Sequence, residues 1–162
     1  MRQVVAGIVA TLLLSSVAFA GLDIGVRADE DGVKSFYLAI GERYQVPEKE
    51  VVVVRQKKIP DEELPVVFFL ASRAGVDRSK VIDLRLKGLS WMDITVRLGL
   101  GADIYYVPVS GNPGPPYGKA YGHFKKKKRE QWREIKLADP DIVNFVNLKF
   151  MSEHYGYSPD EI

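Results

Sequence analysis

The sequence predicts a mainly α-helical protein, a compact bundle of short helices built from helix-turn-helix hairpins, with a long Gly/Pro-rich loop near residues 110–123. Three observations support this fold class. Apolar residues recur at three- and four-residue spacing, residues that start and stop helices lie between these runs, and one hairpin pattern recurs along the chain. The hydrophobic content of 46% and the charged content of 27% are those of a globular protein with a core.

The first twenty residues predict a secretory signal peptide. They contain one charge, Arg2, then an apolar run from Val4, and they end in the small-x-small pattern Ala18-Phe19-Ala20. We therefore expect cleavage between Ala20 and Gly21 and a periplasmic or secreted protein. The alternative is a leader retained as a membrane anchor. The chain has no cysteine, which excludes disulfides and lipid attachment through a cysteine.

After the leader, we expect a flexible N-terminal lead at residues 21–32 and a single helical domain at residues 33–162. Helical spacing begins near Phe36, and Pro47 is suited to the first turn of the next helix. The four valines at 51–54 favour a strand by propensity, but acidic residues before them and basic residues after them favour a short buried helix. Residues 66–74 are apolar on nearly every side and predict the central helix of the core.

The hairpin at residues 77–100 has the clearest signals. Asp77 is placed to cap its first helix and Gly88 to end it. Ser90 can cap the second helix. Asp93 lies three residues later, where a carboxylate can accept a hydrogen bond from the backbone N–H of the capping residue. Trp91, Ile94 and Leu98 share one face of this second helix, so Trp91 is predicted to be buried.

The remainder is predicted as an extended segment at 104–109, the loop at 110–123, one or two helical turns at 131–135, and a last long helix capped by Asp139. That helix should end near Gly156, and residues 158–161 read as one more helix start. Three segments share a pattern of apolar helix, break, one apolar residue and second helix start. They are residues 36–51, 66–81 and 147–162.

Residues 88–99 resemble the first helix and turn of bacterial helix-turn-helix DNA-binding proteins. That family requires a recognition helix with polar side chains after Gly99, where this chain has Tyr105-Tyr106-Val107-Pro108. The segment is therefore predicted to be a structural hairpin, and DNA is not the expected partner.

The best candidate binding site is the end of the Gly/Pro-rich loop with the basic run that follows it. Eight basic and two acidic residues lie between positions 119 and 136. Tyrosine rings offer stacking faces, and cationic side chains can bind phosphate, carboxylate or sulfated sugar. The alternative is a solvated loop with no specific ligand. The candidate residues are Tyr117, Lys119, Tyr121, His123, Lys125, Lys126, Lys127, Lys128 and Arg129.

The sequence gives no catalytic constellation, no metal site and no expected cofactor, because it has no cysteine nucleophile and its two histidines lack ligand spacing. His123 could act as an acid or base beside Lys119 and Tyr121, which would suit a small hydrolase.

Two stretches, residues 114–123 and 152–161, resemble small exported bacterial proteins with no assigned activity, and this resemblance implies no functional residues. The leading hypothesis is a non-enzymatic periplasmic module for protein interaction or structure, with an unknown envelope protein as its partner. The alternatives are a binder of an anionic polymer or lipid surface through residues 117–133, and a small hydrolase using His123.

Overall fold

The computed structural model describes residues 30–111 and 113–162, and over these ranges the chain forms helices and no strand. This confirms the mainly α fold. The α-helices are α1 (Glu30–Tyr44), α2 (Glu48–Gln56), α3 (Leu64–Ala74), α4 (Arg78–Leu86), α5 (Trp91–Arg97), α6 (Gly118–Lys125) and α7 (Asp139–Tyr155). Short 3-10 helices lie between them: η1 (Asp61–Glu63), η2 (Ala102–Tyr105) and η3 (Arg129–Glu134).

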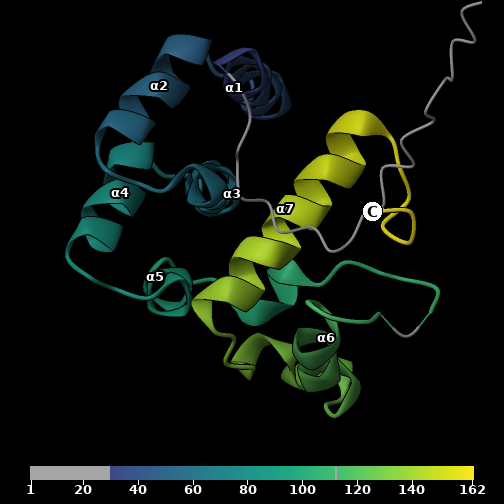
Figure 1. Cartoon of the computed structure of the whole chain (residues 1–162). Helices are drawn as coiled ribbons and strands as arrows, with labels where there is room; N and C mark the ends of the chain where they lie inside the picture. Colours follow the sequence, from purple (N-terminus) through teal and green to yellow (C-terminus); the bar gives the residue numbers. More distant parts are fainter. Residues whose placement is uncertain (1–29, 112) are drawn as a thin grey trace, which may run out of the picture.

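Helix α3 lies at the centre of the bundle, with α2 and α4 on one side and α7 on the other (Figure 1). Every residue of α3 from Leu64 to Ala71 is buried, as expected for a helix that is apolar on all sides. Helix α2 confirms the helical interpretation of the four valines, with Val51 and Val54 inward and Val53 half exposed. Trp91 is fully buried, as predicted.

The same type of turn follows four of the helices in the first half of the fold. In each copy a residue in the left-handed conformation ends a helix, and the apolar residue after it donates its N–H to the carbonyl five positions back. This bonding satisfies carbonyls that a helix end leaves orphaned. The pairs of left-handed and apolar residues are Gln45 and Val46, Gly75 and Val76, Gly88 and Leu89, and Gly99 and Leu100.

The predicted repeat is therefore present in its first two copies. Its first two copies form the hairpins α1–α2 and α3–α4, and the same turn recurs at Gly88 and Gly99. The third copy is incomplete. Gly156 ends α7 in the left-handed conformation, but residues 159–161 form a turn rather than a second helix.

Three predicted boundaries were wrong. Helix α1 begins at Glu30, inside the predicted lead, and residues 1–29 lie outside the described chain. The predicted extended segment at 104–109 begins with the end of η2, so only its later residues are extended. The predicted loop at 110–123 stops at Tyr117, because α6 starts at Gly118.

The predicted signal peptide also lies outside the described residues. Within residues 30–111 and 113–162, no helix has the length and apolarity to cross a membrane.

A network of charged side chains joins α3, α4, α5 and α7. Arg85 of α4 donates from Nε and Nη2 to Glu63 at 3.0 and 2.5 Å, and from Nη1 to Asp139 at 2.6 Å. Asp139 also accepts the backbone N–H of Trp91 at 2.7 Å. Asp139 was predicted to cap its own helix. Ala138 takes that place, and the Asp139 carboxylate instead serves the first turn of α5.

Replacing Trp91 with alanine is expected to lower the free energy of unfolding by about 3 to 5 kcal/mol, because it empties a fully buried site. Chemical denaturation followed by circular dichroism measures this. The exposed Val96 on the same helix is the control, and Val96→Ala should change stability by no more than about 0.5 kcal/mol. Equal stabilities for the parent and Trp91→Ala would show that α5 is not part of the core.

The cap of α4 predicts a pH effect. Asp77 accepts the Ser79 N–H at 2.8 Å, and this hydrogen bonding lowers the pKa of the Asp77 carboxyl in the folded state. Such a group stabilises the fold above its unfolded pKa and loses that effect as pH falls. Asp77→Asn should melt below the parent near neutral pH, and the difference should vanish below the ordinary aspartate pKa of 3.8. A pH-independent difference in Tm would contradict this.

Candidate functional site

The predicted site residues lie on α6 and the segment after it, but they do not form one cluster. Lys119 and the run from Lys125 to Arg129 are exposed, whereas Tyr117 and His123 are half-buried. Tyr121 is buried in the core. The structure therefore separates a cationic surface from the tyrosine that was expected to stand beside it.

Tyr121 was wrongly predicted to offer a stacking face. It is 2% exposed, and its hydroxyl donates to the Val107 carbonyl at 2.6 Å. Its ring packs edge-on against Phe145, with 5.0 Å between ring centroids. Burial, together with nearby tyrosine and aspartate charges, raises the pKa of Tyr121 above its usual value. This side chain supports the fold rather than a ligand.

We call residues 125–129 the basic segment. The side chain of Trp132 holds the backbone at the start of this segment. Its indole N–H lies 3.1 Å from the carbonyls of both Phe124 and Lys127, at the two ends of the turn. The Trp132 ring packs on Tyr106 at 4.4 Å and on Phe124 at 5.2 Å between centroids. The cations are thus presented on a backbone that is held in place.

The basic segment lies between two helices: it leads into η3, as the predicted helical turns at 131–135 implied, and it also follows α6, which was not predicted. Lys125 is the last residue of α6 and Lys126 is its C-cap. The carbonyl end of a helix carries partial negative charge, so cations there stabilise the helix by about 0.3 to 1 kcal/mol each. This favourable position of Lys125 and Lys126 was not predicted, because residues 118–123 were interpreted as a loop.

His123 lies on α6, and the structure gives it no partner for catalysis among the described residues. The Tyr121 hydroxyl that was expected nearby is bound to Val107. Over residues 30–111 and 113–162, no group of three or more His, Asp or Glu side chains is placed to hold a metal ion.

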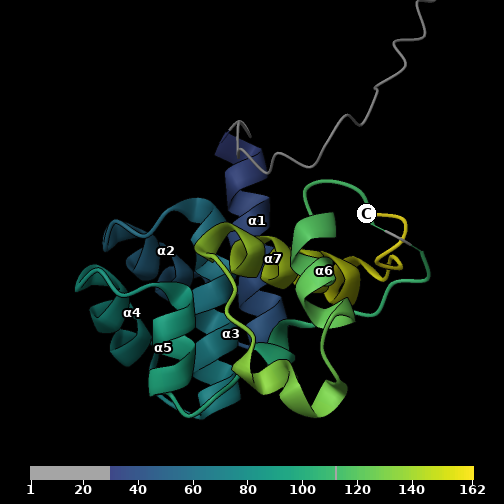
Figure 2. The same cartoon turned by 90° about the horizontal axis from the view of Figure 1, so that it is seen from below.

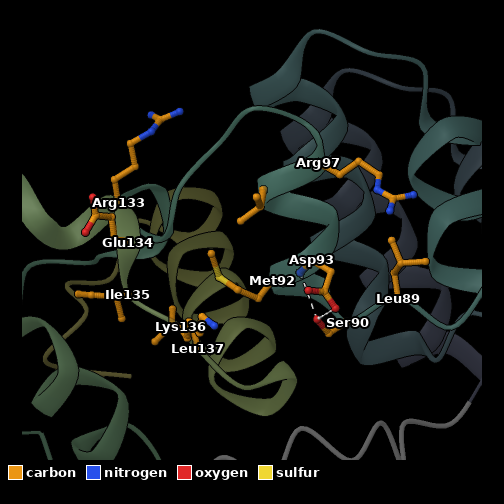
Figure 3. A pocket seen from close by; sticks show the side chains of 11 residues that line it. Leu89, Ser90, Met92, Asp93, Arg97, Arg133, Glu134, Ile135, Lys136 and Leu137 are labelled. Atoms are coloured by element: carbon orange, nitrogen blue, oxygen red, sulfur yellow. Dashed lines mark hydrogen bonds between the residues drawn. The ribbon is translucent and has the colours of Figure 1, made fainter.

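A groove of about 750 Å³ lies between α5 and the segment that leads into α7 (Figure 3). We call it the α5 groove. Met92 and the exposed Val96 line its helical side, and Ile135 and Leu137 line the opposite side. Charged residues surround this apolar centre: Asp93, Arg97, Arg133, Glu134 and Lys136.

The wall opposite α5 has the character of an unpaired strand. Ile135 has φ −65° and ψ 137°, and side chains alternate from buried Ile135 to exposed Lys136 to buried Leu137. Within the described chain, the backbone N–H and C=O groups of Lys136 and Leu137 have no hydrogen-bonding partner. This wall therefore offers backbone donors and acceptors, beside apolar side chains that are largely buried.

Two long-range contacts set the spacing of the groove walls. At one end the guanidinium of Arg133 donates to the Gly99 carbonyl at the end of α5. At the other end Asp139 accepts the N–H of Trp91 at the start of α5. The groove therefore depends on contacts between residues that are 34 and 48 positions apart.

The α5 groove was not predicted from the sequence. The alternation of apolar and charged residues at 135–137 is a local signal for an extended segment, but three residues are too few to distinguish it from a helix end. The position of α5 opposite this segment follows only from the tertiary contacts.

No family model, curated protein or solved structure matches this chain, so the interpretation of both surfaces depends on their own geometry.

Removing the Asp139 carboxylate tests the contact that holds α7 to α5. Asp139→Ala should lower the free energy of unfolding by about 1.5 to 3 kcal/mol, because Arg85 and the Trp91 N–H both lose a charged acceptor. Asp141→Ala, in the same helical turn, is the control. Asp141 only approaches the Ala138 N–H at 3.4 Å, so its loss should cost less than about 1 kcal/mol. Equal losses in urea denaturation would contradict this role for Asp139.

Proposed function

We propose that this protein is a non-enzymatic interaction module of the periplasm or the secreted fraction, and that it binds anionic envelope material through the basic segment. The ligand chemistry is a cluster of negative charges, as on a polymer or on lipid headgroups. The periplasmic location depends on the predicted signal peptide, residues 1–20.

The observation that carries this proposal is the pair of hydrogen bonds from the Trp132 indole to the backbone of the turn that begins the basic segment. Solubility alone requires only dispersed charges on mobile side chains. Here, neighbouring cations repel one another, yet they extend from one turn of the backbone. The carbonyls at the two ends of this turn both accept a hydrogen bond from the Trp132 indole. A preformed backbone reduces the entropy lost on binding, so this arrangement favours recognition of an anionic ligand.

DNA fits the structure less well than other polyanions. The residues of the helix-turn-helix-like segment that would support a recognition helix are buried in the core, including Trp91, Ile94 and Thr95. The element after Gly99 is the 3-10 helix η2, with Ala102 and Tyr105 buried, and not a long helix with polar side chains.

Replacing Lys125, Lys126, Lys127 and Lys128 with glutamine tests the proposal. We expect the variant to lose most of its affinity for vesicles that contain anionic lipid and for a soluble polyanion, with a shallower salt dependence for the remaining binding. Stability should fall slightly, because Lys125 and Lys126 lie at the negative end of α6. Vesicle sedimentation and fluorescence titration at low and high salt measure these effects.

A variant with the same change in net charge is the control. The four control residues are exposed and lie away from the basic segment: Lys80 on α4, Lys57 and Lys58 directly after α2, and Lys87 directly after α4. Their replacement by glutamine should leave most of the binding intact. Equal binding by the parent and the Lys125–Lys128 variant at both salt concentrations would reject the proposal, and equal losses in both variants would reduce it to a net-charge effect.

A further inference from the structure

We propose that the α5 groove receives an extended peptide segment of a partner protein, which adds as a strand to residues 135–137 and carries acidic side chains alternating with apolar ones. This inference concerns a different surface from the basic segment. It therefore can fail while the anion-binding proposal stands, and the reverse also holds.

The backbone of the groove wall supports strand addition. Lys136 and Leu137 lie between Ile135 and Ala138, whose backbones are both extended, and leave their N–H and C=O groups without partners in the described chain. An unpaired extended segment of this kind is a template for another strand. In strand addition, backbone hydrogen bonds supply affinity, and pockets for alternate side chains supply specificity.

The apolar centre of the groove is suited to the side chains of such a strand. Val96 is 60% exposed although it lies between charged residues on α5, and its neighbour one turn earlier, Met92, faces the cavity (Figure 3). A peptide strand placed along residues 135–137 would direct every second side chain toward these two residues. The volume of about 750 Å³ is within the range of sites that enclose a ligand.

The charge around the groove selects the partner. The rim has three cations, Arg97, Arg133 and Lys136, against the two carboxylates of Asp93 and Glu134. The surplus is therefore positive and favours acidic side chains. A second copy of this face would bring the same surplus of positive charge, so it fits this groove less well than an acidic partner does.

Selection from random peptides displayed on phage, against the full chain at moderate salt, tests the proposal. We expect enriched sequences in which apolar and acidic residues alternate, and their synthetic peptides should bind in isothermal titration. Methylation of the peptide backbone nitrogens that face residues 135–137 should weaken binding by about tenfold or more, since it removes the pairing donors.

Two matched variants locate the binding site. Val96→Glu places a negative charge inside the groove and should weaken binding of the selected peptides by about tenfold or more. Val53→Glu makes the same change at a similarly exposed helical valine on α2 and should leave binding unchanged. Circular dichroism of both variants controls for folding.

Three outcomes would overturn the proposal. They are the absence of an enriched sequence class, equal peptide binding by Val96→Glu and Val53→Glu, and displacement of the peptides by anionic vesicles, which would place them on the basic segment. Sedimentation of the protein alone provides a further check. If the protein forms a dimer that Val96→Glu dissociates, a second copy covers the groove. This result would overturn the peptide proposal in favour of self-association.

Discussion

The arrangement of the helices depends on Arg85, which holds two carboxylates from distant parts of the chain. Glu63 is 9% exposed, so its charge is stable only with a bonded partner, and Arg85 supplies that partner with two hydrogen bonds. The same guanidinium binds Asp139 and lies 4.6 Å from the Trp91 ring centroid. One side chain of α4 thereby fixes the starts of α3, α5 and α7, and the start of α7 in turn places the strand-like wall of the α5 groove.

The elements predicted correctly from sequence are those whose determinants lie within a few residues of each other. Ser90 caps α5 by accepting the N–H of Asp93 at 3.1 Å, and Gly75 ends α3 because its φ of 63° suits a residue without Cβ. Both signals can be read from residue type and spacing. The burial of α3 was predictable for a similar reason, because its first eight residues are all apolar and give the helix no polar face.

The features that the sequence did not predict depend on contacts between distant segments. Gly118 was interpreted as a loop residue, yet it lies in α6. A Cβ there would lie 2.7 Å from the carbonyl oxygen of Pro113, five positions earlier, so in this case the reason is local but appears only once the chain has turned. The burial of Tyr121 is decided by Val107 and Phe145, and the role of Asp139 by Arg85. No local pattern distinguishes these residues from a loop glycine, a stacking tyrosine or a helix cap.

The short helix η3 links the two candidate surfaces mechanically. Trp132 reaches back to hold the basic segment, and the next residue, Arg133, reaches across to the Gly99 carbonyl and sets one end of the groove. Gly101 makes this placement possible, because a Cβ on it would lie 2.9 Å from the Arg133 Cα and force η3 away from η2. A shift of η3 would therefore move the cations and open the groove together. The two candidate surfaces therefore share one structural support, although different side chains form each of them.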